Sequence, residues 1–173
     1  LRATTELNKD DQQAWSALEA RAAEPNAFLS PNFVLPALEH LEAGRSAMLL
    51  WVERRGAGSP ELMAVGVFHG TLGTRAFPWP HLAAYQSEHT YLGGLLVDAD
   101  EIRPAVAEIQ RFLGRLGGRW KGLELPKVAV GGPLAQAVES LSGQAGRPAQ
   151  MLGAQERAML TLADCGEDLL REA

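Results

Sequence analysis

The spacing of hydrophobic residues near the start of the chain predicts two helices. In the first, Asp10 or Asp11 can accept a hydrogen bond from a free backbone N–H group and cap the N-terminus, and a turn at residues 25–26 ends the helix. The apolar residues of this helix recur at helical spacing: Trp15, Leu18 and Ala22.

The second helix begins with a serine and a proline that favour a helix start. Ser30 offers a hydroxyl cap, and Pro31 suits the first helical position. Pro36 would cost about 3 kcal/mol in a helix interior, so the helix either bends there or effectively begins nearer Leu35. Its apolar stripe consists of Phe33, Val34, Ala37, Leu38 and Leu41.

Apolar runs in the middle of the chain predict an antiparallel meander. Residues 47–54 and 61–69 read as two strands joined by the loose turn at 56–60. Residues 70–77 could continue the meander. We expect residues 78–90 to form a loop, because two prolines at its start remove hydrogen-bond donors that a strand needs.

The next segment predicts a strand–helix–strand unit. Residues 91–97 read as a strand buried on both faces, and residues 122–125 read as a short second strand. Gly117 and Gly118 end the helix between them. The apolar face of this helix consists of Ile102, Val106, Ile109, Leu113 and Leu116.

The last part of the chain predicts one more helix and a closing hairpin. Gly132 and Pro133 start the helix, whose apolar residues are Leu134, Val138 and Leu141. Residues 149–152 and 157–162 are short strand candidates. Alternating strands and helices of this kind define an α/β fold.

The composition places these elements in one globular domain. A chain of 173 residues, with 46% apolar and 21% charged residues, is long enough to bury a sizeable core. The formal net charge is −5, and no tract of basic residues is present, which argues against nucleic acid as a partner. The first residue is Leu1 and not Met, so we expect the sequence to be part of a longer protein.

The chain contains no candidate for a membrane span. Its longest apolar runs, such as residues 47–52, are far shorter than the roughly 18 residues that a spanning helix requires. A single cysteine, Cys165, excludes an internal disulfide and fits a reducing compartment. We therefore expect a cytoplasmic protein.

Three sequence features indicate a family. A tryptophan lies in the first predicted helix, Pro-Asn-Ala-Phe-Leu-Ser-Pro opens the second at residues 25–31, and His-Thr-Tyr-Leu-Gly-Gly-Leu-Leu-Val-Asp covers the buried strand at residues 89–98. Together with the order of the elements, they resemble the GNAT acyltransferase superfamily. Within it, residues 12–170 resemble the N-terminal half of the Fem-type, cellulose-biosynthesis-associated acetyltransferase-like proteins.

This resemblance implies a fold and a domain organisation. It implies a three-layer α-β-α arrangement, in which a mixed, mostly antiparallel sheet is flanked by about four helices. Residues 1–173 would be a single GNAT-like domain and the N-terminal half of a two-domain protein. The C-terminal half, absent from this chain, would hold acyl-CoA and the transferase site.

The segment that would bind a coenzyme in a working GNAT domain is acidic here. Members of the superfamily hold the CoA pyrophosphate on a Gln/Arg-x-x-Gly-x-Gly/Ala loop between a strand and the following helix, where free N–H groups attract phosphate. The corresponding residues 97–102 contain Asp98, Asp100 and Glu101, which repel a pyrophosphate. The nearest textual match, residues 111–116, lies inside a predicted helix. We expect no bound cofactor, although the parent protein could use acetyl-CoA.

The predicted loop after the meander concentrates aromatic and polar side chains where substrate groups could bind. The alternative is an ordinary surface loop in which two of the aromatic rings pack on the edge of the core. No metal site is expected, because the spacing of the histidines fits no zinc pattern. The candidate substrate-binding residues are Trp79, His81, Tyr85, Gln86, His89 and Tyr91.

No residue of the chain is a convincing catalytic nucleophile. Ser30 is better explained as a helix cap, and no Gly-x-Ser-x-Gly motif occurs. Acidic neighbours would raise the pKa of Cys165 and leave an inert thiol. We therefore assign no catalytic residue.

Three functions remain open. The first is a non-catalytic half of an acyltransferase, which shapes the cleft for an amine or sugar acceptor and packs on a C-terminal catalytic half or another subunit. The second is a stand-alone module that binds protein or glycan on a degenerate GNAT fold. The third is a single-domain acetyl-CoA-dependent N-acetyltransferase, which the acidic segment at 98–101 disfavours.

Overall fold

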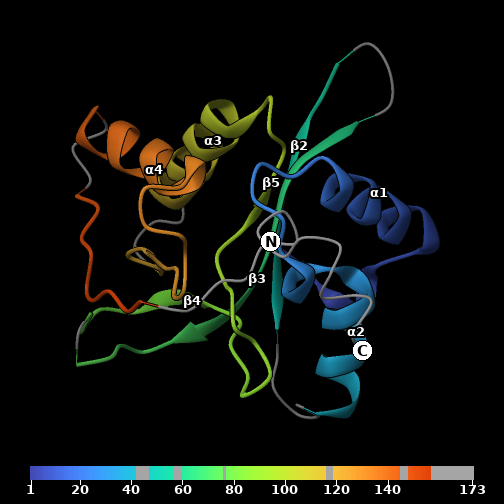
Figure 1. Cartoon of the computed structure of the whole chain (residues 1–173), viewed down its shortest axis with the longest axis horizontal. Coiled ribbons are helices and arrows are strands. Elements are labelled where there is room, and N and C mark those ends of the chain that lie inside the picture. Colours follow the sequence, from blue (N-terminus) through green and yellow to red (C-terminus); the bar gives the residue numbers. More distant parts are fainter. Residues whose placement is uncertain (42–46, 57–59, 76, 116–118, 145–147, 157–173) are drawn as a thin grey trace, which may run out of the picture.

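The computed structural model describes residues 1–41, 47–56, 60–75, 77–115, 119–144 and 148–156. Within these residues the chain forms four α-helices and a six-stranded sheet (Figure 1). The helices are α1 (Lys9–Ala20), α2 (Pro31–His40), α3 (Ile102–Arg115) and α4 (Pro133–Gln144). The strands are β1 (Arg2–Ala3), β2 (Met48–Arg54), β3 (Glu61–Thr71), β4 (His81–Ala84), β5 (Leu96–Val97) and β6 (Leu123–Glu124). Two 3-10 turns, η1 (Thr4–Glu6) and η2 (Ala27–Leu29), precede α1 and α2.

The sheet is open, mixed and mostly antiparallel. Strands β1, β2, β3, β4 and β6 follow one another in this order, and β5 also pairs with β3. The β4–β6 pair is parallel, and the other strand pairs are antiparallel. The predicted α/β class and the mixed, mostly antiparallel sheet are therefore confirmed.

Strands β4 and β5 occupy the same side of β3, one after the other. The Tyr85 N–H group, directly after β4, donates to the Val67 carbonyl at 2.7 Å. Leu96 of β5 then faces Val65. Only Gly66 separates the two points on β3, whereas the chain makes an excursion of residues 86–95 between them. This excursion interrupts what would otherwise be a single edge along β3.

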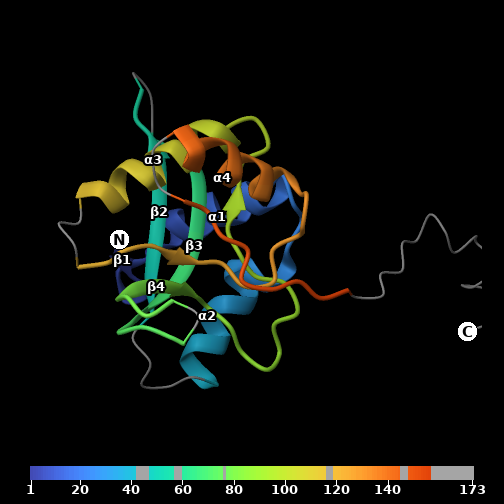
Figure 2. The same ribbon diagram turned by 90° about the vertical axis from the view of Figure 1, so that its left-hand side faces the viewer.

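Helices cover both faces of the sheet (Figure 1). Buried side chains of α1 and α2 form one hydrophobic cluster with one face of the sheet, and those of α3 and α4 form a second cluster with the other face. Figure 2 looks onto the side of α3 and α4, with β2 and β3 behind them. Strand β3 contributes to both clusters because its side chains alternate in direction.

A β-bulge in β3 reverses this alternation near its start. Val52 of β2 faces Ala64, but the next residue of β2 faces Leu62, so Met63 is an extra residue in β3. As a result Met63 and Ala64 both belong to the cluster under α3 and α4, whereas Leu62 and Val65 both belong to the cluster under α1 and α2. Both faces of β3 therefore remain buried through the bulge, while the order in which its side chains alternate changes.

The N-terminal cap of α2 is the predicted residue, whereas the cap of α1 is not. The Ser30 hydroxyl accepts a hydrogen bond from the Asn32 N–H, as expected, and Pro36 lies within a helix that continues to His40. The first helix begins earlier than predicted. Its cap is Asn8 and not Asp10 or Asp11, because the Asn8 carboxamide accepts the Asp11 N–H while the Asp11 carboxylate accepts the Asn8 N–H.

Two predicted boundaries in the middle of the chain are wrong. The predicted loop 78–90 contains β4, which starts directly after the second proline and pairs with the end of β3. The predicted strand 91–97 is reduced to β5, because Tyr91 and Leu92 are exposed and lie in the excursion. Residues 149–152 form no strand, and the expectations for 117–118, 157–162 and Cys165 lie outside the described residues.

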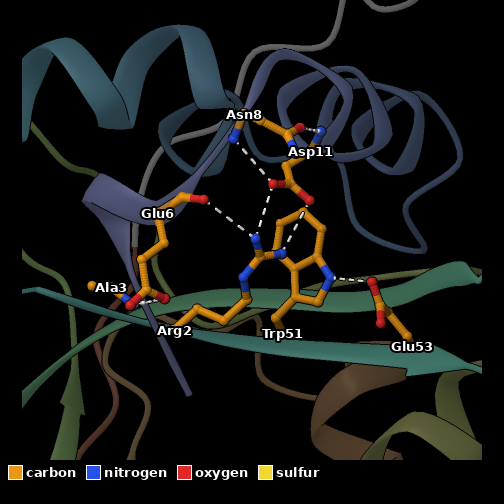
Figure 3. A network of polar contacts seen from close by, with 7 residues as sticks. All are labelled: Arg2, Ala3, Glu6, Asn8, Asp11, Trp51 and Glu53. Atoms are coloured by element: carbon orange, nitrogen blue, oxygen red, sulfur yellow. Dashed lines mark hydrogen bonds and ion pairs between the residues drawn. The ribbon is translucent and has the colours of Figure 1, made fainter.

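A network of polar contacts fixes the N-terminus to α1 and β2 (Figure 3). The Arg2 guanidinium donates two hydrogen bonds to the Asp11 carboxylate, at 3.0 and 2.9 Å, and lies over the ring of Trp51 at 5.1 Å. The Trp51 indole N–H donates to the Glu53 carboxylate at 2.7 Å. Hydrogen bonding by Arg2 holds the pKa of Asp11 below its ordinary value. The network therefore gives the two-residue strand β1 a defined place on the sheet edge.

No helix within the described ranges is both long and apolar enough to cross a membrane.

Close packing around Gly93 predicts a sensitive position in the excursion. We expect Gly93→Ala to lower the free energy of unfolding by about 1–3 kcal/mol, because the added Cβ would lie 2.4 Å from the Pro126 carbonyl oxygen. Denaturant unfolding measures this change. Gly56→Ala is the matched control, since nothing lies within 4 Å of a Cβ at that position. Equal stability of the two variants would contradict the packing described here.

Candidate functional site

The structure separates the predicted substrate-binding residues into three places. Trp79 and His81 lie at the start of β4, and Tyr85 directly follows its end. Gln86, His89 and Tyr91 lie in the excursion. Of these six residues, only the last three belong to one segment of the surface.

His81 and Tyr85 are part of the protein interior. His81 has no exposed surface, and its two ring nitrogens lie 2.7 Å from the Trp79 carbonyl oxygen and 3.0 Å from the Glu124 carboxylate of β6. Tyr85 is 1% exposed and belongs to the cluster under α1 and α2, with its ring 6.0 Å from that of His69. Both side chains therefore hold the sheet together and present no surface to a ligand in this structure.

The exposure of Trp79 and Tyr91 differs from the alternative interpretation of the loop, in which both rings pack on the edge of the core. Trp79 is 60% exposed and Tyr91 is 64% exposed. Both rings therefore project outwards, at opposite ends of β4. Trp79 stays separate from the other candidates.

The excursion contacts two other loops, residues 24–28 and 126–132. We call these two loops, together with residues 86–94 of the excursion, the three-loop cluster. The Asn26 carboxamide donates to the Gly93 carbonyl at 3.1 Å, and the Gly93 N–H donates to the Lys127 carbonyl at 3.3 Å. The Lys127 ammonium donates to the Thr90 carbonyl. Thr90 is itself buried, and its hydroxyl oxygen accepts the Ser87 N–H at 2.9 Å. These bonds hold the backbone on both sides of Tyr91.

An aromatic row connects the exposed ring of Tyr91 to helix α2. The Tyr91 ring meets the ring of Phe28 edge-on at 5.7 Å, and Phe28 meets Phe33 at 5.4 Å with the planes at 90°. Phe28 and Phe33 are half-buried. The row therefore fixes the Tyr91 ring while most of its surface remains open to a ligand.

Glu24 brings a partly buried carboxylate into the same cluster. One of its oxygens is buried without a hydrogen-bond partner among the described residues, and the carboxylate accepts the Leu134 N–H in the first turn of α4. Gly132 makes this approach possible, since a Cβ there would lie within 2.0 Å of the carboxylate oxygen. Burial raises the pKa of Glu24, and the Leu134 N–H offsets part of this effect. Glu24 thus occupies the N-terminus of α4.

The acidic residues before α3 are also engaged within the chain. The Asp98 carboxylate accepts hydrogen bonds from the Arg21 guanidinium and from the Asp100 N–H. The carboxylate of Glu101 pairs with Arg54. Residues 21–23 lie along the outer edge of β5, where the Ala23 N–H donates to the Val97 carbonyl at 2.8 Å. The carboxylates and backbone groups of the strand–helix junction are therefore already bonded to other residues of the protein.

The starts of α3 and α4 consequently differ from a phosphate-binding loop. Such a loop presents free backbone N–H groups and no competing negative charge. Here Asp98 and Glu101 precede α3, and Glu24 lies against α4. Among the described residues no group of three or more His, Cys, Asp or Glu side chains could hold a metal ion.

Sequence reasoning missed the roles of Glu24, Asn26 and Lys127. The sequence marks residues 24–26 as a turn, but no local pattern indicates that Glu24 reaches the first turn of α4. Lys127 has a φ angle of 57°, in the left-handed region that few non-glycine residues adopt. Because the left-handed conformation is usually adopted by glycine, asparagine or aspartate, a lysine at this position does not predict it.

Comparison with family models, with curated proteins and with solved structures gave no match. Function is therefore inferred from the geometry and from the sequence resemblance.

The partly buried carboxylate of Glu24 predicts a pH-dependent effect of Glu24→Gln. Ionisation of Glu24 costs more in the folded than in the unfolded chain, so wild-type stability decreases as pH rises from about 4.5 through the raised pKa of Glu24. We expect the melting temperature of Glu24→Gln minus that of the wild type to be larger at neutral pH than below pH 4.5.

Thermal unfolding over this pH range measures the difference. Glu88→Gln is the control, because Glu88 is exposed in the same cluster. A difference for Glu24→Gln that is constant with pH, or that falls as pH rises, would show that Glu24 ionises as easily in the fold as outside it.

Proposed function

We propose that this chain is the non-catalytic, GNAT-like N-terminal half of a Fem-type acyltransferase. In this proposal the three-loop cluster forms part of the acceptor cleft, beside a catalytic half outside this chain. The order of elements supports it: two helices, the antiparallel strands β2, β3 and β4, then β5, α3, β6 parallel to β4, and α4. The helices on both faces of the sheet agree with the three-layer arrangement that the resemblance implies.

The observation that carries the proposal is the engaged strand–helix junction. A coenzyme pyrophosphate at residues 97–102 would have to displace Arg21 from Asp98 and Arg54 from Glu101, and would then face both carboxylates. The start of α4, the alternative helix N-terminus nearby, is already occupied by Glu24. Coenzyme binding is therefore assigned to the catalytic half.

The three-loop cluster is the surface best suited to an acceptor. Its Tyr91 ring is exposed on a backbone that hydrogen bonds hold in place, which lowers the entropy lost on binding. Gln86 and His89 add groups that can donate or accept hydrogen bonds on the same segment. An amine or a sugar hydroxyl could be oriented by such groups.

A stand-alone binding module is the second candidate. A domain that packs on a missing half should expose one continuous apolar face, because monomers rarely expose large apolar patches. In the described part of the chain, none of the exposed large hydrophobic residues lies within a helix or strand, so no helix or sheet face presents them; among them are Leu41 after α2, Leu72 after β3 and Val130 before α4. This distribution favours a module that binds a ligand by itself.

The first test is titration calorimetry of acetyl-CoA into the purified 173-residue chain. We expect no binding, because the junction before α3 offers no free phosphate cradle. A catalytically active acetyltransferase in the same buffer serves as the control for the coenzyme. Binding with a micromolar Kd would refute the non-catalytic assignment and support the single-domain acetyltransferase.

The second test concerns acceptor binding in the full-length gene product. We expect Tyr91→Ala to raise the KM for the acceptor by about ten-fold and to leave the KM for acetyl-CoA unchanged, since only the acceptor contacts the ring. Steady-state kinetics with a panel of amines and amino sugars measures both constants.

Tyr91→Phe should behave as the wild type, because it keeps the ring. Leu41→Ala, an exposed apolar side chain at the end of α2, should have no effect on either constant. If Tyr91→Ala leaves the acceptor KM unchanged, the three-loop cluster is not part of the acceptor cleft.

A further inference from the structure

The connection between β3 and β4 carries two of the most exposed apolar side chains of the described chain. We call residues 72–75 and 77–80 the hairpin tip. Leu72 is 88% exposed and Trp79 is 60% exposed. The hairpin tip projects at the lower left of Figure 1, beyond the end of the sheet. A leucine and a tryptophan so placed contribute little to the folded core.

Contacts connect the two described sides of the hairpin tip. The Thr74 N–H donates to the Phe77 carbonyl at 2.8 Å, and the Phe77 N–H donates to the Thr74 hydroxyl at 3.0 Å. Gly73 has a φ angle of 142° and lies against the Pro78 carbonyl, an approach that a side chain would prevent. Leu72 and Trp79 therefore lie next to residues that contact each other across the hairpin tip.

Positive charge surrounds the hairpin tip. Arg75 lies within it, and the Lys121 N–H donates to the Pro80 carbonyl at 2.7 Å, which places Lys121 beside it. Arg119 lies over the ring of Trp120, 5.3 Å from its centre, on the same approach to β6. All three cations are exposed.

These cations differ from several other arginines of this acidic chain. Arg2, Arg21 and Arg54 are paired with carboxylates, whereas in the described part of the chain Arg75, Arg119 and Lys121 form no ion pair. Residues 62–87 contain no Asp or Glu at all, although the chain has 21 acidic residues. The hairpin tip itself therefore carries a cation and no carboxylate, and the Glu124 carboxylate of the nearby strand β6 faces His81.

We propose that the hairpin tip is a docking site for an anionic lipid surface. Leu72 and Trp79 enter the boundary between head groups and acyl chains, where an aliphatic side chain and an indole ring are both favoured. Arg75, Lys121 and Arg119 pair with lipid phosphates. A protruding tip with few apolar groups is better suited to a deformable lipid surface than to a protein pocket of fixed shape.

This inference is independent of the proposed acyltransferase role. The hairpin tip precedes His81 at the start of β4, whereas the three-loop cluster begins after Tyr85 at its end. A protein docked by the tip would keep Tyr91 at the opposite end of β4. Failure of acetyl-CoA or acceptor experiments would leave lipid binding unaffected, and the reverse also holds.

Co-sedimentation of the 173-residue chain with lipid vesicles tests the proposal. We expect binding to vesicles of phosphatidylcholine mixed with phosphatidylglycerol at low salt, and weak or no binding to phosphatidylcholine alone. The double variant Leu72→Ser with Trp79→Ala should bind at least about ten-fold more weakly. Arg75→Ala and Lys121→Ala should each weaken binding roughly five-fold, with the loss disappearing at high salt.

Matched controls distinguish the hairpin tip from general surface stickiness. Leu41→Ser removes a leucine that is 60% exposed at the end of α2, and Arg55→Ala removes an exposed cation after β2. Both should bind as the wild type, and all variants should keep the wild-type melting temperature. Absence of binding to anionic vesicles, or equal loss in the controls, would overturn the proposal.

Discussion

Pairing of β3 on both of its sides is the constraint on which the other elements depend. β2 runs along one side, and β4 and β5 share the other. Its side chains reach both hydrophobic clusters, so each helix pair packs against the same strand from a different face. The bulge at Met63 extends this double burial to the start of the strand. Without β3, both hydrophobic clusters would lose the strand against which their helices pack.

The two surfaces to which we assign functions, the hairpin tip and the excursion, lie at the two ends of β4 because of this arrangement. β4 is held between β3 and β6 and therefore cannot move freely at either end. The hairpin tip precedes it, and the three-loop cluster follows it. Strand β4 thus separates two exposed aromatic rings. Trp79 lies before the strand and Tyr91 lies after it.

Strong periodicity in the sequence predicted the long elements, and tertiary pairing decided the short ones. The apolar face of α3 and the apolar runs of β2 and β3 carry enough local information to be recognised. β4 does not, since His-Leu-Ala-Ala after a proline has weak strand preference and gains its conformation from β3 and β6. Of the predicted substrate-binding residues, Gln86, His89 and Tyr91 lie on one segment, and their role stays a prediction. The contact of Glu24 with α4 joins residues far apart in sequence, which no local pattern encodes.

The interruption between β4 and β5 separates the register of the sheet from the length of the excursion. Tyr85 and Leu96 face β3 residues on either side of Gly66, so the two ends of the excursion are held only about 7 Å apart by the sheet. Strand register is fixed before the excursion leaves and after it returns. Because doubling the length of a loop costs only about 0.6 kcal/mol, insertions and deletions there should spare the register of the sheet. Changes at the exposed residues 88–89 and 91–92 therefore alter the surface of the excursion while the pairing of the strands stays the same.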